Sequence, residues 1–290
     1  MANSIALAKV YTDLLDEVYK KSALTANLES DESLARAGAN ANEIVIPKIS
    51  MDGLADYSRN SGYVNGDVTL TWETVKFNYE RGRAFTVDDM DNEETQNIAF
   101  GKLAGEFIRT KVVPELDAFR FATYAAVTGA GTAAATLATG ADVIAALRTA
   151  TSAMDEAEVP MEDRHLYITP TLYGLVQDLD TNKSKEVLSR FASITQVPQT
   201  RFYSAIKLKD GTTLGEETGG YAKAEGAVDL NFEIIHKPAV LQFTKHAVPK
   251  IISPEQNQDA DAWKYGYRNY GLCDTYENKA AGIYVHKKDK

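Results

Sequence analysis

The histidines are the first residues to examine for chemistry, and they stand apart in the sequence. The four are His165, His236, His246 and His286, and no two form an H-x-x-x-H or H-E-x-x-H pair. Such a pair places two imidazoles on one helical face, where both can bind one zinc ion. His236 and His246 are ten residues apart in a β-prone region. The spacing therefore indicates no metal site.

The single cysteine, Cys273, could act as a nucleophile with a distant histidine. It lies in an alternating, strand-like segment, and no helix start stands beside it to lower its thiol pKa. A buried structural thiol is the better interpretation. One cysteine also allows no intrachain disulfide and no four-cysteine zinc site.

Other catalytic patterns are missing from the sequence. There is no G-x-S-x-G turn, no G-x-G-x-x-G after a strand, and the glycines of Thr128–Gly140 lead to no Gly-Lys-Ser/Thr. With 41 acids in the chain, chance carboxylate pairs are expected and none is singled out as an acid–base couple. We expect no enzyme, no cofactor and no metal.

Five acids crowd one short segment: Asp88, Asp89, Asp91, Glu93 and Glu94. Their spacing is not the alternating pattern of an EF-hand calcium loop. Acids are favourable at a helix N-terminus, whose free N–H groups and dipole attract negative charge. The cluster therefore predicts a helix start, with Thr86 as the N-cap candidate and Asp89 three residues later.

Composition limits the partners. The net charge is −10, the pI is about 5.0, and no Lys/Arg cluster is longer than the pair Lys287-Lys288. Nucleic-acid binding by phosphate neutralisation needs a basic patch or tail, so contact with DNA should be loose and not sequence-specific. No run approaches the ~20 apolar residues of a membrane span. Acids at positions 13, 16 and 17 also argue against a signal peptide in Met1–Lys20.

The N-terminal region should lie outside a packed domain. Ser4–Lys20 has the apolar spacing of a short amphipathic helix. Ser22–Asn42 is polar and rich in small residues, which is typical of an extended arm. A frayed terminus is the alternative interpretation.

A long β-hairpin should follow. Glu43–Ser50 and Val68–Tyr79 are β-prone, and a loop rich in Gly, Asn and Tyr separates them. The second run carries apolar residues on both faces, although a two-stranded ribbon is marginal in water. Either the hairpin folds back on its own domain, or another chain covers it.

The central region predicts a helix from Asn92 to about Val127, kinked or restarted at Pro114 because proline lacks an N–H. At 1.5 Å per residue it would span roughly 50 Å, long for a compact domain. The remaining pattern mixes helices and strands. Helices are expected at Ala141–Glu158 and from Pro170, and strands at His165–Thr169, Ala239–Thr244, Ala247–Ser253, Trp263–Tyr276 and Ile283–His286. The class is α+β with discontinuous domains.

Several segments resemble the major capsid proteins of tailed bacteriophages, in the order found in that family. They are AKVYTDLLDEVYKKSALTANLES at 8–30, FTVDDMDNEET at 85–95, VVPELDAFRFA at 112–122, VPMEDRHLYITPTLYGLV at 159–176, and residues 236–288 from HKPAVLQFTKH to AAGIYVHKK. No one segment is as diagnostic as a zinc signature. The collinear set is more specific, and it covers most of the chain.

The resemblance implies the Hong Kong ninety-seven type of capsid fold. Its parts would be an N-terminal arm at 1–42, an extended β-hairpin loop at 43–83, a peripheral domain at 84–159 plus 237–290 with a spine helix at about 92–127, and an axial domain at 160–236. Proteins of this family form hexamers and pentamers that close into an icosahedral shell around double-stranded DNA. The hairpin would then lie over a neighbouring subunit.

The same resemblance implies a virion protein made in the host bacterial cytoplasm. Its partners would be copies of itself, separate scaffolding, portal and decoration proteins, and packaged DNA held by non-specific contact. The Lys–Asn crosslinking of some relatives is not carried over, since nothing marks a lysine here as reactive. The candidates for contacts between subunits are Lys48, Tyr57, Arg59, Tyr63, Trp72, Arg81 and Arg83.

Two other functions compete with the capsid hypothesis. An encapsulin-type bacterial compartment shares the fold and would need a groove for a cargo peptide. A soluble hydrolase would need a site that the sequence does not reveal.

Overall fold

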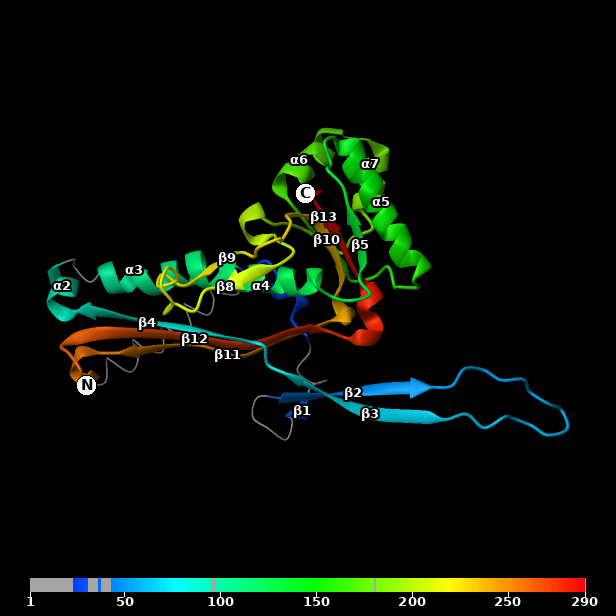
Figure 1. Ribbon diagram of the computed structural model, residues 1–290, viewed down its shortest axis with the longest axis horizontal. Helices are drawn as coiled ribbons and strands as arrows, with labels where there is room; N and C mark the ends of the chain where they lie inside the picture. Colours follow the sequence, from blue (N-terminus) through cyan, green and yellow to red (C-terminus); the bar gives the residue numbers. More distant parts are fainter. Residues whose placement is uncertain (1–22, 31–35, 38–42, 95–97, 180, 290) are drawn as a thin grey trace.

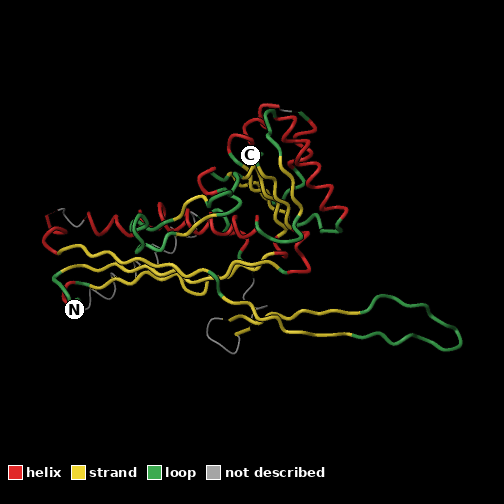
Figure 2. Tube along the Cα trace, viewed as in Figure 1, coloured by secondary structure: helices red, strands yellow, loops and turns green. Residues whose placement is uncertain are grey.

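Figure 1 shows the computed structural model of the chain, which describes residues 23–30, 36–37, 43–94, 98–179 and 181–289. Three parts are evident. A long three-stranded sheet runs alongside a row of helices, and a compact five-stranded sheet with helices stands at one end of it. From the region of that same end a β-hairpin projects in the direction away from the long sheet (Figures 1 and 2). No helix of the described ranges is long and apolar enough to cross a membrane. The predicted Ser4–Lys20 helix lies outside the described residues.

The projecting hairpin consists of β2 (Glu43–Met51) and β3 (Val68–Lys76), and the two-residue strand β1 (Arg36–Ala37) pairs with β2. The antiparallel register pairs Pro47 with Trp72, residue 49 with Leu70, and Met51 with Val68. The hairpin is as expected, except that the second β-prone run divides. β3 ends at Lys76, and the next strand begins at Tyr79 in a different sheet.

The long sheet has the order β11–β12–β4, from Val240–Ile252, Ala262–Thr275 and Tyr79–Asp88. The two strands expected at 239–253 are one strand with a bulge between Thr244 and His246. Thr86 lies inside β4, paired with Lys264, so its assignment as an N-cap is wrong. The helix begins three residues later because the strand pairing continues to Asp88.

The spine consists of α2 (Asp89–Glu94), α3 (Ile98–Phe107), the π-helical turn η3 (Ile108–Val112) and α4 (Val113–Ala125). α3, η3 and α4 follow one another without a break. The π turn lies immediately before Pro114, and the Val113 N–H donates to the carbonyl of Ile108. A wider turn accommodates the proline ring, which would clash with a carbonyl one α-helical turn earlier. The predicted disturbance at Pro114 is therefore a widened turn.

The compact part has a five-stranded sheet in the order β5–β13–β10–β6–β7, from Gly131–Ala134, Ile283–Lys287, Leu230–His236, Arg164–Ile168 and Ser193–Gln196. Helices α5 (Gly140–Glu156), α6 (Pro170–Leu179) and α7 (Asn182–Leu188) cover one face. β5 falls within the glycine-containing segment Thr128–Gly140. The division at 160 and 236 also cuts through this sheet, because β5 and β13 lie outside those limits.

The other face of this sheet packs against α4, and residues 23–30 complete that core. This segment contains the 3₁₀ turn η1 (Ala26–Leu28), and Leu28 is buried among aromatic side chains of α4 and β6. Asp117 of α4 accepts hydrogen bonds from Leu24 N and from both N and Oγ1 of Thr25. The expectation that Ser22–Asn42 is unpacked is therefore wrong for this part.

A short hairpin of β8 (Ile206–Leu208) and β9 (Tyr221–Lys223) lies over the spine. We call residues 209–220, which connect these strands, the clamped loop. Asp210 accepts hydrogen bonds from Thr212 N and Thr213 N. The remaining elements are single 3₁₀ turns: η4 (Gln199–Arg201), η5 (Lys237–Ala239), η6 (Pro254–Gln256) and η7 (Glu277–Gly282).

Candidate inter-subunit surface

The hairpin presents an apolar face to solvent. Exposed fractions are 69% for Met51, 72% for Val68, 53% for Leu70 and 45% for Trp72. Side chains on a strand alternate between faces, and Met51 is the register partner of Val68, so these four residues lie on one side of the ribbon. The opposite side carries Ser50 with Thr69 and, nearer the body, Ile46 with Glu73. The ribbon is therefore amphipathic, with its apolar side uncovered along the distal half.

The root of the hairpin is fixed to the long sheet. Ile44 and Ile46 are buried against Leu241, Phe243 and Leu272 of β11 and β12. The aromatic rings of Phe77 and Tyr270 lie 4.8 Å apart beside this cluster. The hairpin thus leaves the body from a packed base, and its direction is set by that base.

The loop at the hairpin tip has internal order. The rings of Tyr57 and Tyr63 meet edge to face at 4.9 Å, and backbone hydrogen bonds join Ser58 and Gly62 in both directions. Gly62 has φ +82°, a left-handed conformation that suits glycine. Leu54 is fully exposed, at 108% of its reference area. The loop at the tip therefore has a defined conformation, and the apolar side chain of Leu54 projects from it.

The predicted contact residues divide into two groups. Tyr57, Tyr63 and Arg59 are exposed at the tip, and Trp72 lies on the apolar face. Lys48 is paired with Thr71 in the strand register, and its side chain lies outside the described residues. For these five positions the role between subunits stays a prediction.

Arg81 and Arg83 lie on β4, away from the hairpin, and bind within the chain. Arg81 Nε donates to Glu115 of α4 at 2.6 Å, and its Nη2 donates to the Lys209 carbonyl at 2.7 Å. Arg83 Nη2 donates to the Glu217 carbonyl at 3.0 Å. Arg81 joins the clamped loop to the spine, and Arg83 joins the same loop to β4. For these two positions the role between subunits also stays a prediction.

His165 and Cys273, two of the residues whose types could do chemistry, lie in structural environments. His165 Nδ1 lies 2.7 Å from Ser193 Oγ, but the ring is buried and its Nε2 has no hydrogen-bond partner. Cys273 is buried, and burial raises the pKa of its thiol to about 12. A nucleophilic cysteine needs the opposite shift. Among the described residues no group of three or more His, Cys, Asp or Glu could hold a metal ion.

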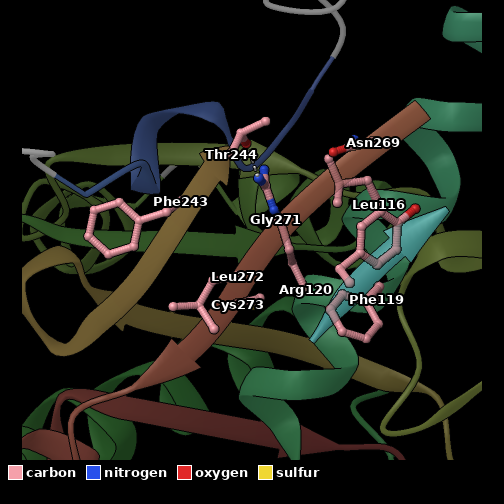
Figure 3. A pocket seen from close by; sticks show the side chains of 10 residues that line it. Leu116, Phe119, Arg120, Phe243, Thr244, Asn269, Gly271, Leu272 and Cys273 are labelled. Atoms are coloured by element: carbon pink, nitrogen blue, oxygen red, sulfur yellow. Dashed lines mark hydrogen bonds between the residues drawn. The ribbon is translucent and has the colours of Figure 1, made fainter. Parts of the chain in front are cut away.

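Figure 3 shows the cavity beside Cys273, between α4 and the long sheet. Leu116, Phe119 and Arg120 of α4 face Thr244 of β11 and Asn269 of β12 across it. Its volume is about 10 Å³. That is the space of one water molecule, whereas small-molecule sites occupy roughly 300–1,000 Å³. The cavity cannot admit a substrate.

Comparisons with known proteins identify the fold. No protein-family model matches the chain, and no curated protein sequence matches it. Solved structures do match. A structure of Gordonia phage Cozz has a TM-score of 0.58 at 13% identity, covering 93% of this chain and 87% of that one. The capsid structure of the cyanophage P-SCSP1u has a TM-score of 0.56 at 14% identity, covering 88% and 86%.

A virus-like particle from Pyrococcus furiosus is similar to the same degree, with a TM-score of 0.55 at 11% identity and 97% and 99% of the two chains covered. At such identities the likeness shows the fold. The chain therefore has the α+β capsid fold that the resemblance implied, and the spine, the long sheet and the projecting hairpin are parts of it.

Proposed function

We propose that this chain is a shell-building subunit, the major capsid protein of a tailed bacteriophage, and that it has no enzymatic activity. The observation that carries the proposal is the uncovered apolar face of the hairpin on a chain with the capsid fold. Soluble monomers rarely expose contiguous apolar patches of this kind, and such patches mark interfaces. The fold alone does not fix the function, and the hairpin supplies the specific feature.

The energetics favour a covered hairpin. Fully burying one large apolar side chain contributes roughly 1.5–3 kcal/mol. Met51, Val68, Leu70 and Trp72 are all at least 45% exposed. A neighbour lying on this face would gain several kcal/mol before the costs of association, by the same area-based estimate. In the described part of the isolated chain, the hairpin is packed against other elements only at its root.

The partners in this proposal are copies of the chain, arranged as hexamers and pentamers in an icosahedral shell. Scaffolding, portal and decoration proteins would be separate chains. Packaged DNA would be touched without sequence preference, in keeping with the net charge of −10. The chain would be made in the host cytoplasm and end in the virion. Residues 43–76 would serve as the extended loop, and the five-stranded sheet with α5–α7 as the axial domain.

The test is deletion of Met51–Gly66, examined by electron microscopy of the purified protein. We expect the deleted chain to fold, judged by circular dichroism, and to form no shells, whereas the parent forms shells or capsomer rings. A matched pair refines the result. Val68→Thr with Leu70→Thr on the apolar face should impair assembly, and Thr69→Ser on the opposite face should not. Normal shells from the deletion would refute the proposal.

A bacterial compartment of the encapsulin type is the second candidate, because the virus-like particle from Pyrococcus furiosus matches over nearly its whole length. The contents of purified shells separate the two. Double-stranded DNA of a defined length supports the capsid, and a single co-purifying protein cargo supports the compartment. The cavity beside Cys273 is too small to support the hydrolase alternative.

A further inference from the structure

The loop at the tip of the hairpin, residues 52–67, contains the dipeptide Asn65-Gly66, and Asn65 is the only asparagine of the sequence that precedes a glycine. Both residues are exposed and lie outside the strands. The backbone nitrogen of the residue after an asparagine can attack the side-chain carbonyl carbon and close a succinimide ring. The attack is intramolecular, so its rate depends on how freely the two atoms can meet.

A turn does not account for this dipeptide. Asn-Gly is the usual sequence of a two-residue hairpin turn, in which both residues have a positive φ. Here the strands end at Met51 and begin again at Val68, so the loop is much longer. Its tight turn is the one that joins Ser58 and Gly62, where Gly62 has φ +82°. The φ angle of Gly66 lies outside the left-handed range, so position 66 does not need glycine for its backbone conformation.

The two groups that would react are not held by hydrogen bonds. Neither the Asn65 side chain nor the Gly66 N–H makes a hydrogen bond within the ranges that the structure describes. The neck of the loop beside them is fixed, because Asp52 N donates to the Asp67 carbonyl at 3.1 Å and Asp67 N donates to Asp52 Oδ2 at 2.9 Å. No hydrogen bond therefore has to break before the Gly66 nitrogen approaches the Asn65 side chain.

Two comparable positions are restrained. Asn60 lies in the same exposed loop, but it is followed by Ser61, whose N–H donates to Ser58 Oγ at 3.2 Å. Asp210 of the clamped loop also precedes a glycine, but its carboxylate accepts hydrogen bonds from Thr213 N at 2.8 Å and from Thr213 Oγ1 at 2.6 Å. In each case one of the two groups needed for ring closure is already bound.

We infer that Asn65 is a site of spontaneous deamidation in which the backbone of Gly66 is the nucleophile. The Gly66 nitrogen bonds to Cγ of Asn65, its proton passes through solvent to the departing amide, and ammonia leaves. Water then opens the succinimide at either carbonyl. One product is aspartate, and the other is isoaspartate, in which the main chain runs through the side-chain methylene. Either product adds a negative charge to a loop that already contains Asp52, Asp56 and Asp67.

The reaction takes place within one chain, so it is independent of the proposed assembly. The test is peptide mapping by mass spectrometry of dilute full-length chain after incubation at neutral and mildly alkaline pH. The peptide that contains Asn65 should acquire the mass of a carboxyl in place of an amide and separate into aspartate and isoaspartate forms. Conversion should be faster at the higher pH, because the attacking nitrogen must lose its proton. Asn60 should stay intact while most of Asn65 converts, as fragmentation of the same peptide can show.

Gly66→Ala is the matched variant. Its Cβ would lie 3.5 Å from Asp52 Cβ, which is an ordinary contact, so the loop should keep its conformation. The methyl group hinders the approach of the nitrogen and should slow conversion about tenfold, since a misplacement of ~1 Å can cost a reaction ~100-fold. Gly53→Ala is the control in the same loop, where an added Cβ meets nothing within 4 Å, and it should leave the rate unchanged.

Three results would overturn the assignment. Equal rates at Asn60 and Asn65 would show that the restraint on Ser61 is irrelevant and that exposure alone decides. Conversion of Gly66→Ala at the parental rate would exclude attack by this nitrogen. Aspartate without any isoaspartate would indicate direct hydrolysis of the side-chain amide, because only the ring can yield the isomer.

Discussion

Glu233 is a carboxyl group in the centre of the five-stranded sheet, and it makes the stability of the subunit depend on pH. It lies on β10, is fully buried, and neither of its oxygens has a hydrogen-bond partner among the described residues. Burial raises its pKa well above the usual range, and the positive charge of Lys287 offsets only part of that effect. An unpaired carboxylate in this position would be costly, so the native state keeps the proton.

The sign of the pH dependence follows from the two states. In the unfolded chain a glutamate releases its proton near pH 4.3. Between that pH and the raised native pKa, the native state binds one proton more than the unfolded state. The free energy of unfolding therefore falls by about 1.4 kcal/mol for each pH unit in this window. The contribution of Glu233 to the free energy of unfolding is complete below its pKa in the unfolded chain. It is lost as pH rises toward its pKa in the native state.

The perturbation is Glu233→Gln, which keeps the shape and removes the proton equilibrium. The measurement is urea denaturation of dilute, unassembled chain from pH 5 to pH 8. The free energy of unfolding of the variant, relative to that of the parent, should increase by up to about 1.4 kcal/mol for each pH unit. Glu225→Gln, at an exposed position, is the control and should show a constant difference. A constant difference for Glu233→Gln as well would refute a protonated glutamate in the core.

Two further changes test the packing of the fold. Leu28→Ala should destabilise the chain by about 2–5 kcal/mol in the same denaturation assay, because Leu28 is buried in the core beside α4, whereas Leu54→Ala should change it little. Gly140→Ala should destabilise strongly, since its Cβ would lie 2.2 Å from the Leu175 carbonyl oxygen. At Gly174, inside α6, an added Cβ would meet nothing within 4 Å. Gly174→Ala should therefore stabilise the chain by roughly 0.5–1 kcal/mol and raise its melting temperature.

Elements with a clear period were predictable from the sequence. α5 and α6 lie where their apolar spacing and Pro170 place them, and β12 alternates Trp263, Tyr265 and Tyr267 on one face as expected. The exposed apolar face of β3 was also predictable, because Val68, Leu70 and Trp72 recur at every second position. The sequence pattern does not show which surface would cover that face, because the pattern identifies no partner.

Other parts were not predictable because their stabilising contacts are long-range and polar. β10 is a fully buried central strand, yet Asn231, Glu233 and His236 interrupt its apolar run. Asn231 binds His286 and the Ala135 carbonyl, so its polarity is satisfied by segments far away in the sequence. Residues 23–30 read as a polar arm for the same reason. Thr25 is buried only because Asp117 and Arg120 bind it.

The charge of the chain bears on how copies would meet in the assembly that we propose. Each chain carries a net charge of −10, so free copies repel one another. At physiological ionic strength that repulsion is screened beyond about 8 Å. Raising the salt concentration should therefore speed the encounter of copies in the proposed assembly.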